Sequence, residues 1–584
     1  MNVQRIIIKK FRSIEKADIW VNSLNAIVGQ NNSGKSSLLR ALNAFFNYED
    51  EIEAFKKGNH NYVSRSVAKI EIHFNNFESQ NVPNKYINNR LIYIEVSFVL
   101  SQNGVARTIK YKKGSRWIAD AQVLEIIKKQ IHFILIPPNR NAAALEEVEN
   151  NVLQSLIEEK LKSATINRDN YTNKFKTAVE YLENNALKNV ATDTQKEYPL
   201  SNQFDIQIKY SKTISYKNYL KDVSISINEL GISHPLIECG SGIQSLTIIS
   251  LYNLLGKARD ENIIIGLEEP ETNLHPQAQK DLISYFKSLV QNGNILQFFF
   301  TTHSSNMIDN IDHTDIILFS KINDESRGFK SKIKRLPKNF FEKYSIEDFK
   351  YYQFYRYRNS EFFFSKFIVI TESKNEVEVI KKMGVKAGQD YDVNGLAYLN
   401  LEGVDKAKYT IYLLKELDIP FFLVVDKDFF AHYSNHEYEN SLDSMGFPLY
   451  KSEFKNEELV KTLISNNEKR VKILEYINTN HTALLDLLEE YNIVSMRYSL
   501  DLDLAATTLG QQKYYELLNI PLSERSTQEL TQKRKALKKI DRILTIIDSI
   551  DNRNLPYSYS RIKKIMNKIK RELNSVYQAH ANNH

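Results

Sequence analysis

The chain has 584 residues, of which 42% are hydrophobic and 26% are charged, a composition typical of ordinary globular proteins. Its N-terminal residues lead into a strand pattern and not into a signal peptide, and no apolar run approaches the roughly 20 residues of a membrane span, which excludes a membrane pump within this chain. The single cysteine, Cys239, excludes intramolecular disulfides and cysteine-based zinc sites and fits a reducing cytoplasm, while the net charge of +7 permits a nucleic-acid partner without demanding one.

Alternating and apolar runs predict a series of strands in the first 140 residues. The expected strands cover residues 3–8, 17–21, 24–28, 68–75, 91–100 and 131–136. Arg12 lies in the turn between the first two strands, and this position is equally consistent with a nucleotide contact and with a surface turn residue. The strands at 68–75 and 91–100 are typical of an antiparallel meander.

The segment from Gly29 to Ser36 reads Gly-Gln-Asn-Asn-Ser-Gly-Lys-Ser and fits the phosphate-binding P-loop pattern G-x-x-x-x-G-K-[ST]. An apolar strand precedes it and a helical pattern follows it, so backbone N–H groups and the positive end of a helix dipole meet at one point. Lys35 is expected to reach the β- and γ-phosphates of ATP, and Ser36 is expected to ligate Mg²⁺. The predicted nucleotide-binding residues here are Gly29, Asn32, Gly34, Lys35, Ser36 and Ser37.

Residues 141–190 differ from the strands before them, because they are charged, helical in period and poor in glycine and proline. Such an insertion is typical of a helical arm or a dimerisation element, and it is too short and irregular for a long coiled coil. We therefore assign residues 1–140 to the first part of a nucleotide-binding domain, residues 141–225 to the insertion, and residues 226–340 to the second part of the domain.

A second glycine-rich turn, from Gly240 to Gln244, precedes an apolar helix that reaches Leu255. Such a turn offers the hydroxyl of Ser241 and backbone N–H groups, including that of Gly242, to a phosphate. A plain helix cap has the same pattern, and the position of the turn between the P-loop and the next motif favours the phosphate contact.

Two carboxylates follow the apolar strand at residues 263–267. Glu268 is expected to hold the Mg²⁺ through water, and Glu269 is expected to orient or deprotonate the attacking water. A later strand, at residues 297–302, ends at His303, which this order of motifs indicates to be a γ-phosphate sensor. A strand that ends in a charged turn is the alternative interpretation of the glutamate pair.

A polar, charged and tyrosine-rich stretch at residues 322–360 is interpreted as the domain junction. Beyond it, three apolar strands alternate with helical patterns, which predicts a parallel sheet. These strands cover residues 366–371, 396–401 and 420–425, and the acidic residues at their ends are Glu372, Glu402, Asp426 and Asp428. Because ligands bind at the carboxyl ends of parallel strands, we expect these side chains to lie together.

Four carboxylates at one edge of a sheet repel each other unless a cation neutralises them. Oxygen ligands without histidine or cysteine suit Mg²⁺ or Mn²⁺, and two such ions about 4 Å apart would form a phosphodiester-cleaving centre. The Asp426-x-Asp428 spacing predicts that both side chains lie on one face of an extended segment. Charged loop ends of a solvated α/β domain are the alternative interpretation.

The P-loop, the Ser-Gly-x-Gln turn, the Glu-Glu-Pro segment and the strand-end histidine, in that order, resemble the ABC-type ATPases of the SMC/Rad-like superfamily. The segment from Leu267 to Pro276 is most similar to the OLD (overcoming lysogenization defect) branch. The resemblance implies two ATPase heads that enclose two ATP molecules, with Ser241 and Gly242 of one head on the nucleotide of the other. It therefore implies a homodimer or a higher homo-oligomer. Gln102 is a candidate for the Q-loop glutamine of the superfamily.

Glu372, Gly403 and the Asp426-x-Asp428 pair resemble a Toprim domain, and an ATPase followed by a Toprim domain is the OLD order. The expected catalytic residues are Glu269, Glu372, Asp426 and Asp428. The resemblance adds Glu376, Asp501 and Asp503, although a polar strand face explains the last two nearly as well. The implied metal ligands are Ser36, Glu268, Glu372, Glu376, Asp426, Asp428, Asp501 and Asp503. Ser373 stands where Toprim domains usually have glycine, which puts the geometry of this loop in doubt.

The C-terminal segment carries clusters of lysine and arginine between Lys533 and Arg571. These clusters are either a surface that follows a DNA backbone or the solvated faces of helices. The resemblance implies one late lysine that stabilises the transition state, and the sequence does not identify it. We assign residues 360–510 to the Toprim domain and residues 511–584 to a helical basic region. The fold class is α/β: an ABC-type ATPase head of mixed sheets with a P-loop core and a helical insertion, followed by a Toprim parallel-sheet domain with a helical C-terminal part.

The combined expectation is a cytoplasmic, ATP-regulated DNA endonuclease that nicks or cuts with Mg²⁺ or Mn²⁺ and has no membrane partner. The resemblance implies an anti-phage defence effector, as in Gabija-type or retron-associated nucleases, with a partner from an adjacent gene such as a helicase or a reverse transcriptase. A different interpretation is an ATP-gated DNA-binding clamp or sensor with a degenerate Toprim domain. A primase or topoisomerase is a third, but the single cysteine excludes the four-cysteine zinc element of bacterial primases, and no topoisomerase cleavage module is recognisable.

Overall fold

The structure is a computed structural model that divides into two compact units, Met1–Ile333 and Lys334–His584. It describes residues 1–64, 66–77, 81–101, 104–138, 145, 148–163, 177–178, 180–197, 207, 223–229, 231–259, 261–292, 295–347, 360–401, 407–434 and 441–581. The boundary between the units falls inside the predicted junction at residues 322–360. The first part of that stretch is not a linker, however, because it contains strand β15 (Gly328–Arg335) of the first unit's sheet.

One sheet of the first unit is antiparallel, with strand order β2-β1-β4-β6-β7-β8 and with β5 paired to β6. Its strands are β1 (Asn2–Phe11), β2 (Ile14–Trp20), β4 (Ala68–Asn75), β5 (Ile87–Asn88), β6 (Leu91–Ser101), β7 (Gly104–Lys113) and β8 (Arg116–Ala119). Ile6 and Ile8 of β1 pair with Ile72 and Ile70 of β4, and all four are fully buried. The alternation that predicts these strands therefore also selects the face that enters the core.

The second sheet of this unit has the order β15-β14-β3-β13-β12-β9, and its strands are parallel from β14 to β9. Its remaining strands are β3 (Leu24–Gly29), β9 (Ile131–Ile136), β12 (Asn262–Glu268), β13 (Ile295–Thr301) and β14 (Ile316–Asp324). Strand β3 lies between β14 and β13, where Ala26 pairs with both Ile316 and Phe300. A central parallel strand is covered on both faces, which is why every residue of β3 is buried, including Asn25.

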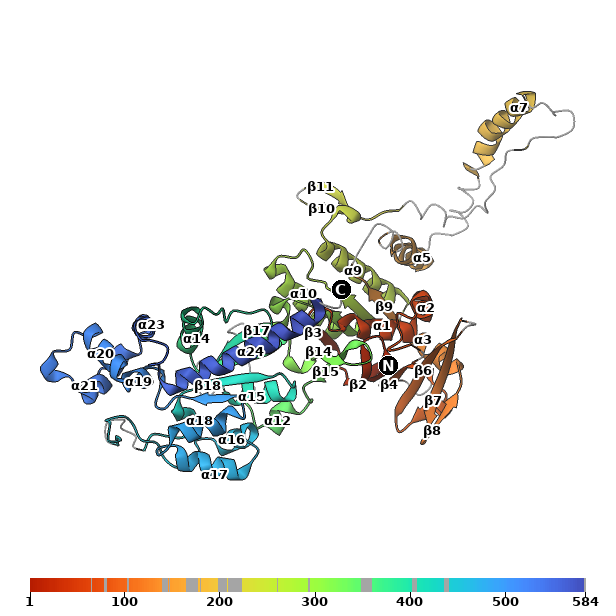
Figure 1. Ribbon diagram of the computed structural model, residues 1–584. Helices are drawn as coiled ribbons and strands as arrows, with labels where there is room; N and C mark the ends of the chain where they lie inside the picture. The colour runs from red at the N-terminus through yellow and green to blue at the C-terminus, as the bar shows by residue number, and fades with distance from the viewer. Residues whose placement is uncertain are drawn as a thin grey trace. The chain divides into compact units, whose positions relative to one another are not determined.

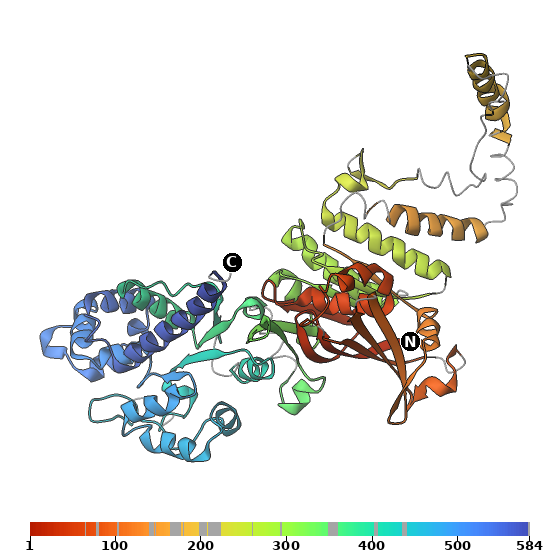
Figure 2. The ribbon, with the colours of Figure 1, turned by 45° about the vertical axis from the view of Figure 1, so that its right-hand side comes forward.

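Helix α1 (Lys35–Phe46) leads out of β3 (Figure 2). Its buried side chains share one core with residues of both sheets. Leu42 and Phe45, for example, belong to the same core as Ile70 of the antiparallel sheet and Phe299 of the parallel sheet. The other helices here are α2 (Tyr48–Lys56), α3 (Gln122–Lys128), α9 (Ser241–Arg259), α10 (Pro276–Asn292) and α11 (Ser305–Ile308).

The described parts of the predicted insertion between residues 145 and 197 are helical. They comprise π-helical turns at Glu149–Leu153 and Glu183–Leu187, α5 (Gln154–Ser163) and α7 (Lys188–Glu197). A two-stranded antiparallel sheet of β10 (Ser226–Glu229) and β11 (Ile232–Pro235) follows and leads into α9.

The second unit is built on a four-stranded parallel sheet with the order β17-β16-β18-β19. Figure 1 labels β17 and β18 of this sheet. Its strands are β16 (Phe367–Thr371), β17 (Leu396–Asn400), β18 (Phe421–Val425) and β19 (Ile493–Ser495). The helices are α12 (Phe340–Lys343), α14 (Lys374–Lys386), α15 (Ala407–Glu416), α16 (Glu457–Leu463), α17 (Asn467–Tyr476), α18 (His481–Glu489), α19 (Leu500–Ala505), α20 (Thr508–Leu517), α21 (Thr527–Gln532), α22 (Arg534–Leu537), α23 (Ile540–Ser549) and α24 (Tyr557–Ala581).

The long helix α24 packs into the same core as α14 and the parallel sheet, through Ile562, Ile565 and Ile569. This helical layer makes the predicted basic C-terminal region part of the second unit and not a tail. None of the helices in the described ranges is long and apolar enough to cross a bilayer.

Candidate nucleotide and metal sites

The P-loop occupies the connection from β3 to α1, and two of its glycines have no room for a side chain. Gly34 caps α1 with a φ of 95°, and a Cβ atom there would lie 2.2 Å from Ser13 Oγ and 2.3 Å from Ser331 Oγ. Gly29 has a φ of 137°, and its Cβ would lie 1.9 Å from the carbonyl oxygen of Phe319. Only glycine fits this backbone, which turns N–H groups toward one point.

A group of serines holds the loop from behind. Ser331 Oγ on β15 donates a hydrogen bond to the Ser33 carbonyl at 2.6 Å and lies 2.7 Å from Ser13 Oγ. The buried hydroxyl of Ser37 lies 3.3 Å from Ser13 Oγ. The Ser37 side chain therefore faces this cluster, although the sequence suggests it as a nucleotide contact.

Lys35 folds back on the loop itself. Its Nζ donates to the carbonyl oxygens of Gly29 at 3.0 Å and Gln30 at 2.9 Å. Burial lowers the pKa of Lys35 to about 8. A buried ammonium whose charge burial disfavours is a ready partner for an anion, since a phosphate would stabilise its charged form.

Ser36 and Glu268 meet where the P-loop faces the end of β12. Ser36 Oγ donates a 2.7 Å hydrogen bond to Glu268 Oε2, and Arg40 Nε lies 3.5 Å from Glu268 Oε1. Arg12 has a φ of 50°. Burial, and then the charge of Arg40, lowers the pKa of Arg12, so the two arginines lie within electrostatic range of each other. A hydroxyl and a carboxylate, both oxygen ligands, thus share one point, which suits the magnesium of a bound nucleotide, and the arginines beside them suit its phosphates.

Glu269 and His303 face each other at the ends of β12 and β13. Glu269 has a φ of 46°, and its N–H lies 3.2 Å from the Thr301 carbonyl oxygen and 3.1 Å from Thr301 Oγ1. His303 Nε2 lies 3.8 Å from Glu269 Oε1. Burial, and then the charge of Lys35, lowers the pKa of His303 to about 4, so its ring is neutral at pH 7.

The Ser-Gly-x-Gln turn starts helix α9. Ser241 Oγ donates to the Thr272 carbonyl, and a Cβ on Gly242 would lie 2.1 Å from a methyl carbon of Leu274. Gln244 Nε2 donates to the carbonyls of Leu236 at 3.1 Å and Cys239 at 3.0 Å. The glutamine shapes the turn that leads into the helix, and the serine and glycine contact the segment after Glu269.

In the second unit, three carboxylates converge at the carboxyl ends of neighbouring parallel strands. Glu372 follows β16, Asp426 and Asp428 follow β18, and one oxygen of each lies within 4.8 Å of the others. The aspartate pair is not extended as the spacing predicts, because Lys427–Phe429 forms a 3-10 turn. Lys427 between them is buried and donates to the Ile477 carbonyl at 2.6 Å.

Electrostatics in this group favour a bound cation. Burial, and then the charge of Asp428, raises the pKa of Glu372 to about 7. Burial, and then Glu372, raises the pKa of Asp426 well above its usual value. Oδ1 of Asp428 is buried without a hydrogen-bond partner in the described part of the chain. An orphaned carboxylate oxygen among like charges fits a divalent cation with hard oxygen ligands.

Glu376, which the resemblance implies as a metal ligand, lies in the first turn of α14. It forms a capping box with Ser373, in which Glu376 Oε2 accepts from Ser373 N at 2.8 Å and from Ser373 Oγ at 2.6 Å, and Asn375 N donates to Ser373 Oγ. The φ of Ser373 is −136°, an extended conformation open to any residue. The usual glycine is therefore not required here, and the doubt about the loop that Ser373 raises is removed.

Asp501 and Asp503 lie on helix α19 and not on a strand face. Asp503 accepts hydrogen bonds from Arg497 N at 2.8 Å, Tyr498 N at 2.8 Å and Ser558 Oγ at 2.6 Å. Its oxygens hold the backbone before α19, so we no longer propose it as a metal ligand. Asp501 accepts from Ser499 Oγ at 2.8 Å and lies 3.9 Å from Arg534 Nε.

The basic C-terminal residues fall into two groups. Arg561 and Lys564 on α24 form ion pairs with Glu489, and Arg561 pairs also with Asp486. The segment around α22 instead approaches the carboxylates, because the positive charge of Lys538 opposes the rise in the pKa of both Glu372 and Glu376. Asn375 Nδ2 contacts the Lys538 carbonyl at 3.4 Å and links this segment to the start of α14.

Comparison with known proteins identifies both halves of this arrangement. Residues 1–118 and 47–308 match the AAA ATPase domain, and residues 363–428 match the Toprim domain of overcoming lysogenization defect-like proteins. The chain is an ATPase–nuclease of the OLD family. This OLD-family protein is 23% identical to Endonuclease GajA of Bacillus cereus over 73% of its own length and 75% of the relative. It is 21% identical to the OLD nuclease of Thermus scotoductus, over 73% and 82% of the two chains.

An ATP/GTP phosphatase of Helicobacter pylori is 23% identical over 53% of the OLD-family chain and 87% of the relative. Among solved structures, the Smc head domain of Pyrococcus furiosus aligns with a TM-score of 0.34 at 15% identity, over 58% of this chain and 98% of that one. The SMC head domain of Thermotoga maritima aligns with a TM-score of 0.31 at 15% identity, over 58% and 100%.

Sequence reasoning about this OLD-family protein missed three residues of the nucleotide site. Arg40 and Glu51 form an ion pair beside Glu268, and Glu271 Oε1 accepts from the backbone N–H of His303 at 2.7 Å. Arg40 follows Ser36 by one helical turn, and this spacing is the signal that points to it. Two suggested residues, Gln102 and Glu402, lie outside the described residues.

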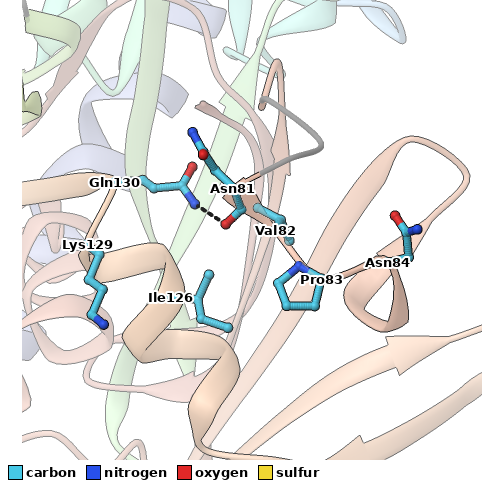
Figure 3. A pocket seen from close by; sticks show the side chains of 7 residues that line it. All are labelled: Asn81, Val82, Pro83, Asn84, Ile126, Lys129 and Gln130. Carbon is cyan, nitrogen blue, oxygen red and sulfur yellow. Dashed lines mark hydrogen bonds between the residues drawn. The ribbon is translucent and has the colours of Figure 1, made fainter.

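A separate hollow in the first unit lies beside α3 and is lined by residues 81–84 with Ile126, Lys129 and Gln130 (Figure 3). Gln130 Nε2 donates to the Asn81 carbonyl at 3.0 Å across its edge. Its lining shares no residue with the P-loop or the carboxylate group, so we assign it no part in the chemistry of this OLD-family protein.

Proposed function

We propose that this OLD-family protein is a metal-dependent DNA endonuclease whose activity is controlled by the ATP state of its first unit. The observation that carries the proposal is the group of Glu372, Asp426 and Asp428, whose oxygens lie within 4.8 Å of one another. The names of the relatives, an endonuclease and a nuclease, support the choice of reaction.

Glu372, Asp426 and Asp428 would hold Mg²⁺ or Mn²⁺. When bound, such an ion would polarise the phosphate and lower the pKa of the attacking water. In the reaction, the oxygen of water bonds to phosphorus, one ester P–O bond breaks, and the departing oxygen gains a proton. The chain fixes Asp426 for this role, because its Oδ1 accepts from Leu500 N at 3.0 Å and its own N–H donates to Glu372 Oε2 at 3.3 Å.

Lys538 is our choice for the late lysine that stabilises the transition state. Its charge opposes the rise in the pKa of both Glu372 and Glu376, and its backbone carbonyl contacts Asn375 at the start of α14, whereas Lys564 pairs with Glu489. A fixed ammonium beside the reacting phosphate stabilises the negative charge that develops there. The neighbouring Lys533 to Arg542 segment is the proposed contact with the DNA backbone.

The proposed ATP site uses Lys35 for the phosphates, Ser36 and Glu268 for Mg²⁺, Glu269 for the water and His303 for the γ-phosphate. We further propose a homodimer or higher homo-oligomer in which Ser241 and Gly242 of one copy complete the site of another. The biological role we propose is anti-phage defence, together with a partner from an adjacent gene. The alternative, a clamp with a degenerate Toprim domain, loses its main support, because Ser373 serves as a helix cap.

A plasmid-nicking assay with Mg²⁺ or Mn²⁺ tests the proposal. It compares the wild type with Asp426→Asn and Lys35→Ala, each with and without ATP. We expect the wild type to cleave, Asp426→Asn to be inactive, and Lys35→Ala to cleave without responding to ATP. If the wild type, assayed alone and with its neighbouring gene product, cleaves no DNA under any nucleotide condition, the nuclease proposal fails and the clamp is favoured.

A further inference from the structure

Arg40 lies on helix α1 exactly where the helical repeat brings it beside Ser36. Residues four apart share one helix face, and both of these side chains reach Glu268. Ser36 Oγ contacts Oε2 at 2.7 Å, and Arg40 Nε lies 3.5 Å from Oε1. From α1, one carboxylate oxygen of Glu268 therefore receives a hydrogen bond, and the other has an ion-pair contact without a hydrogen bond.

The same guanidinium has a second acidic partner. Arg40 Nη1 lies 3.1 Å from Oε1 of Glu51, which belongs to the first turn of α2. Glu51 is almost fully buried, with 3% of its side chain exposed, and it is held in place by Asn43 Nδ2 at 2.8 Å and by a 2.7 Å contact with His60 Nε2. Arg40 itself is 32% exposed, so it is the partner that has room to move.

We propose that Arg40 competes with magnesium for Glu268, and that Glu51 draws Arg40 away when magnesium and nucleotide bind. The inference rests on the proposed role of Glu268 as a magnesium ligand. A cation that arrives at Glu268 competes with the guanidinium for the same carboxylate. Glu51 lowers the cost of that competition, because the displaced guanidinium keeps one anionic partner.

Variants at Arg40 and Glu51 should change the effect of magnesium on nucleotide binding in opposite directions. Arg40→Ala removes the competing cation, so magnesium should strengthen nucleotide binding more than in the wild type. Glu51→Gln leaves Arg40 with Glu268 as its acidic partner, so magnesium should strengthen nucleotide binding less. Each change should be about twofold to fivefold, the range of a partly exposed ion pair. A purely structural role would weaken nucleotide binding in both variants and would not separate them by sign.

The experiment measures the affinity of the full-length protein for a fluorescent N-methylanthraniloyl ATP, with Mg²⁺ and with EDTA. The quantity of interest is the ratio of the two dissociation constants, which reports magnesium coupling and does not require hydrolysis. The variants are Arg40→Ala, Arg40→Lys and Glu51→Gln, and Arg5→Ala is the matched control, because Arg5 pairs with Asp18 on the antiparallel sheet. Arg40→Lys should fall between the wild type and Arg40→Ala.

An unchanged or smaller magnesium ratio in Arg40→Ala overturns the inference. This variant decides the question even if Glu51→Gln does not fold, because Arg40 is partly exposed. The variant Glu268→Gln distinguishes a failure of the proposed magnesium role of Glu268 from a failure of the proposed competition by Arg40. If it keeps the wild-type ratio, or if the wild type has no magnesium effect, the proposed role of Glu268 fails and the inference fails with it. If only Glu268→Gln changes the ratio, the inference alone fails.

Discussion

The hydroxyl of Ser36 donates a 2.7 Å hydrogen bond to Oε2 of Glu268, across 232 positions of the chain. Glu268 is the last residue of β12, and Ser36 lies in the first turn of α1, which follows β3. Only β13 lies between β3 and β12 in the sheet, so the order of strands brings the two residues together. This contact is the geometric basis for the proposed magnesium site.

Replacement of Ser36 by alanine removes the hydroxyl from that site and leaves the P-loop backbone unchanged. We expect ATP hydrolysis to fall roughly 10- to 100-fold, the usual effect of losing one group that supports a metal. Phosphate release measured over a range of Mg²⁺ concentrations checks this. Ser288→Ala, at an exposed hydroxyl on α10 that bonds only within its own turn, is the control. Wild-type hydrolysis by Ser36→Ala at low Mg²⁺ would contradict the assignment.

Gly34→Ala should abolish ATP binding for a different reason. The left-handed φ of 95° costs a non-glycine residue roughly 1–3 kcal/mol, and the new Cβ would collide with Ser13 and Ser331. The loop must shift to relieve both effects. Isothermal titration with ATP measures the loss, and Gly114→Ala is the control, because no atom lies near its Cβ position despite its positive φ.

Asp428→Asn should lower nuclease activity, whereas Asp503→Asn should lower the stability of the fold. Asp428→Asn removes one charge from the carboxylate group, so nuclease activity should fall by roughly 10²-fold or more while the fold is retained. Asp503→Asn replaces an acceptor of three hydrogen bonds in the core, and the free energy of unfolding should fall by about 2 kcal/mol. Chemical denaturation together with plasmid nicking separates them. Equal loss of activity at full stability in both variants would restore Asp503 as a ligand.

Ser373→Gly tests whether the departure from the usual Toprim residue matters. Since the φ of Ser373 is −136°, glycine relieves no strain, and it replaces an N-cap at a cost of only a few tenths of a kcal/mol. Ser373→Ala should cost about 1 kcal/mol, because the capping box is lost. Thermal unfolding measures both changes. A large gain of nuclease activity in Ser373→Gly would contradict the role of Ser373 as a plain helix cap.

His303 should give the ATPase unit a pH-dependent stability. Its pKa falls from 6.5 to about 4 on folding, so between these values the unfolded chain binds more protons than the folded one. The contribution of His303 to the free energy of unfolding is therefore fully present above pH 6.5 and is lost as the pH falls toward 4. Urea unfolding at pH 7, 6 and 5 should show a smaller decline for His303→Gln than for the wild type. Parallel curves for the two proteins would exclude this contribution.

Local sequence was sufficient to predict the functional motifs whose side chains and supporting backbone are formed by adjacent residues. The P-loop, the Glu268-Glu269 pair and the Asp426-x-Asp428 pair each follow an apolar strand, and strand, turn and helix signals lie within a few residues of the motif. Period-2 burial in β1 and β4, and continuous burial in β3 and β13, follow from the same patterns. The order of these motifs was also enough to indicate the family.

The tertiary structure decided which of several chemically equivalent residues face a site. Asp501 and Asp503 have the same side chain two positions apart, yet Asp503 is bonded to Arg497, Tyr498 and Ser558, and Asp501 is turned toward Arg534. Many lysines occur after residue 530, and Lys538 is distinguished by its effect on Glu372 and Glu376. Composition and spacing carry no information on such choices, because they depend on how segments distant in the chain pack around the same parallel strands.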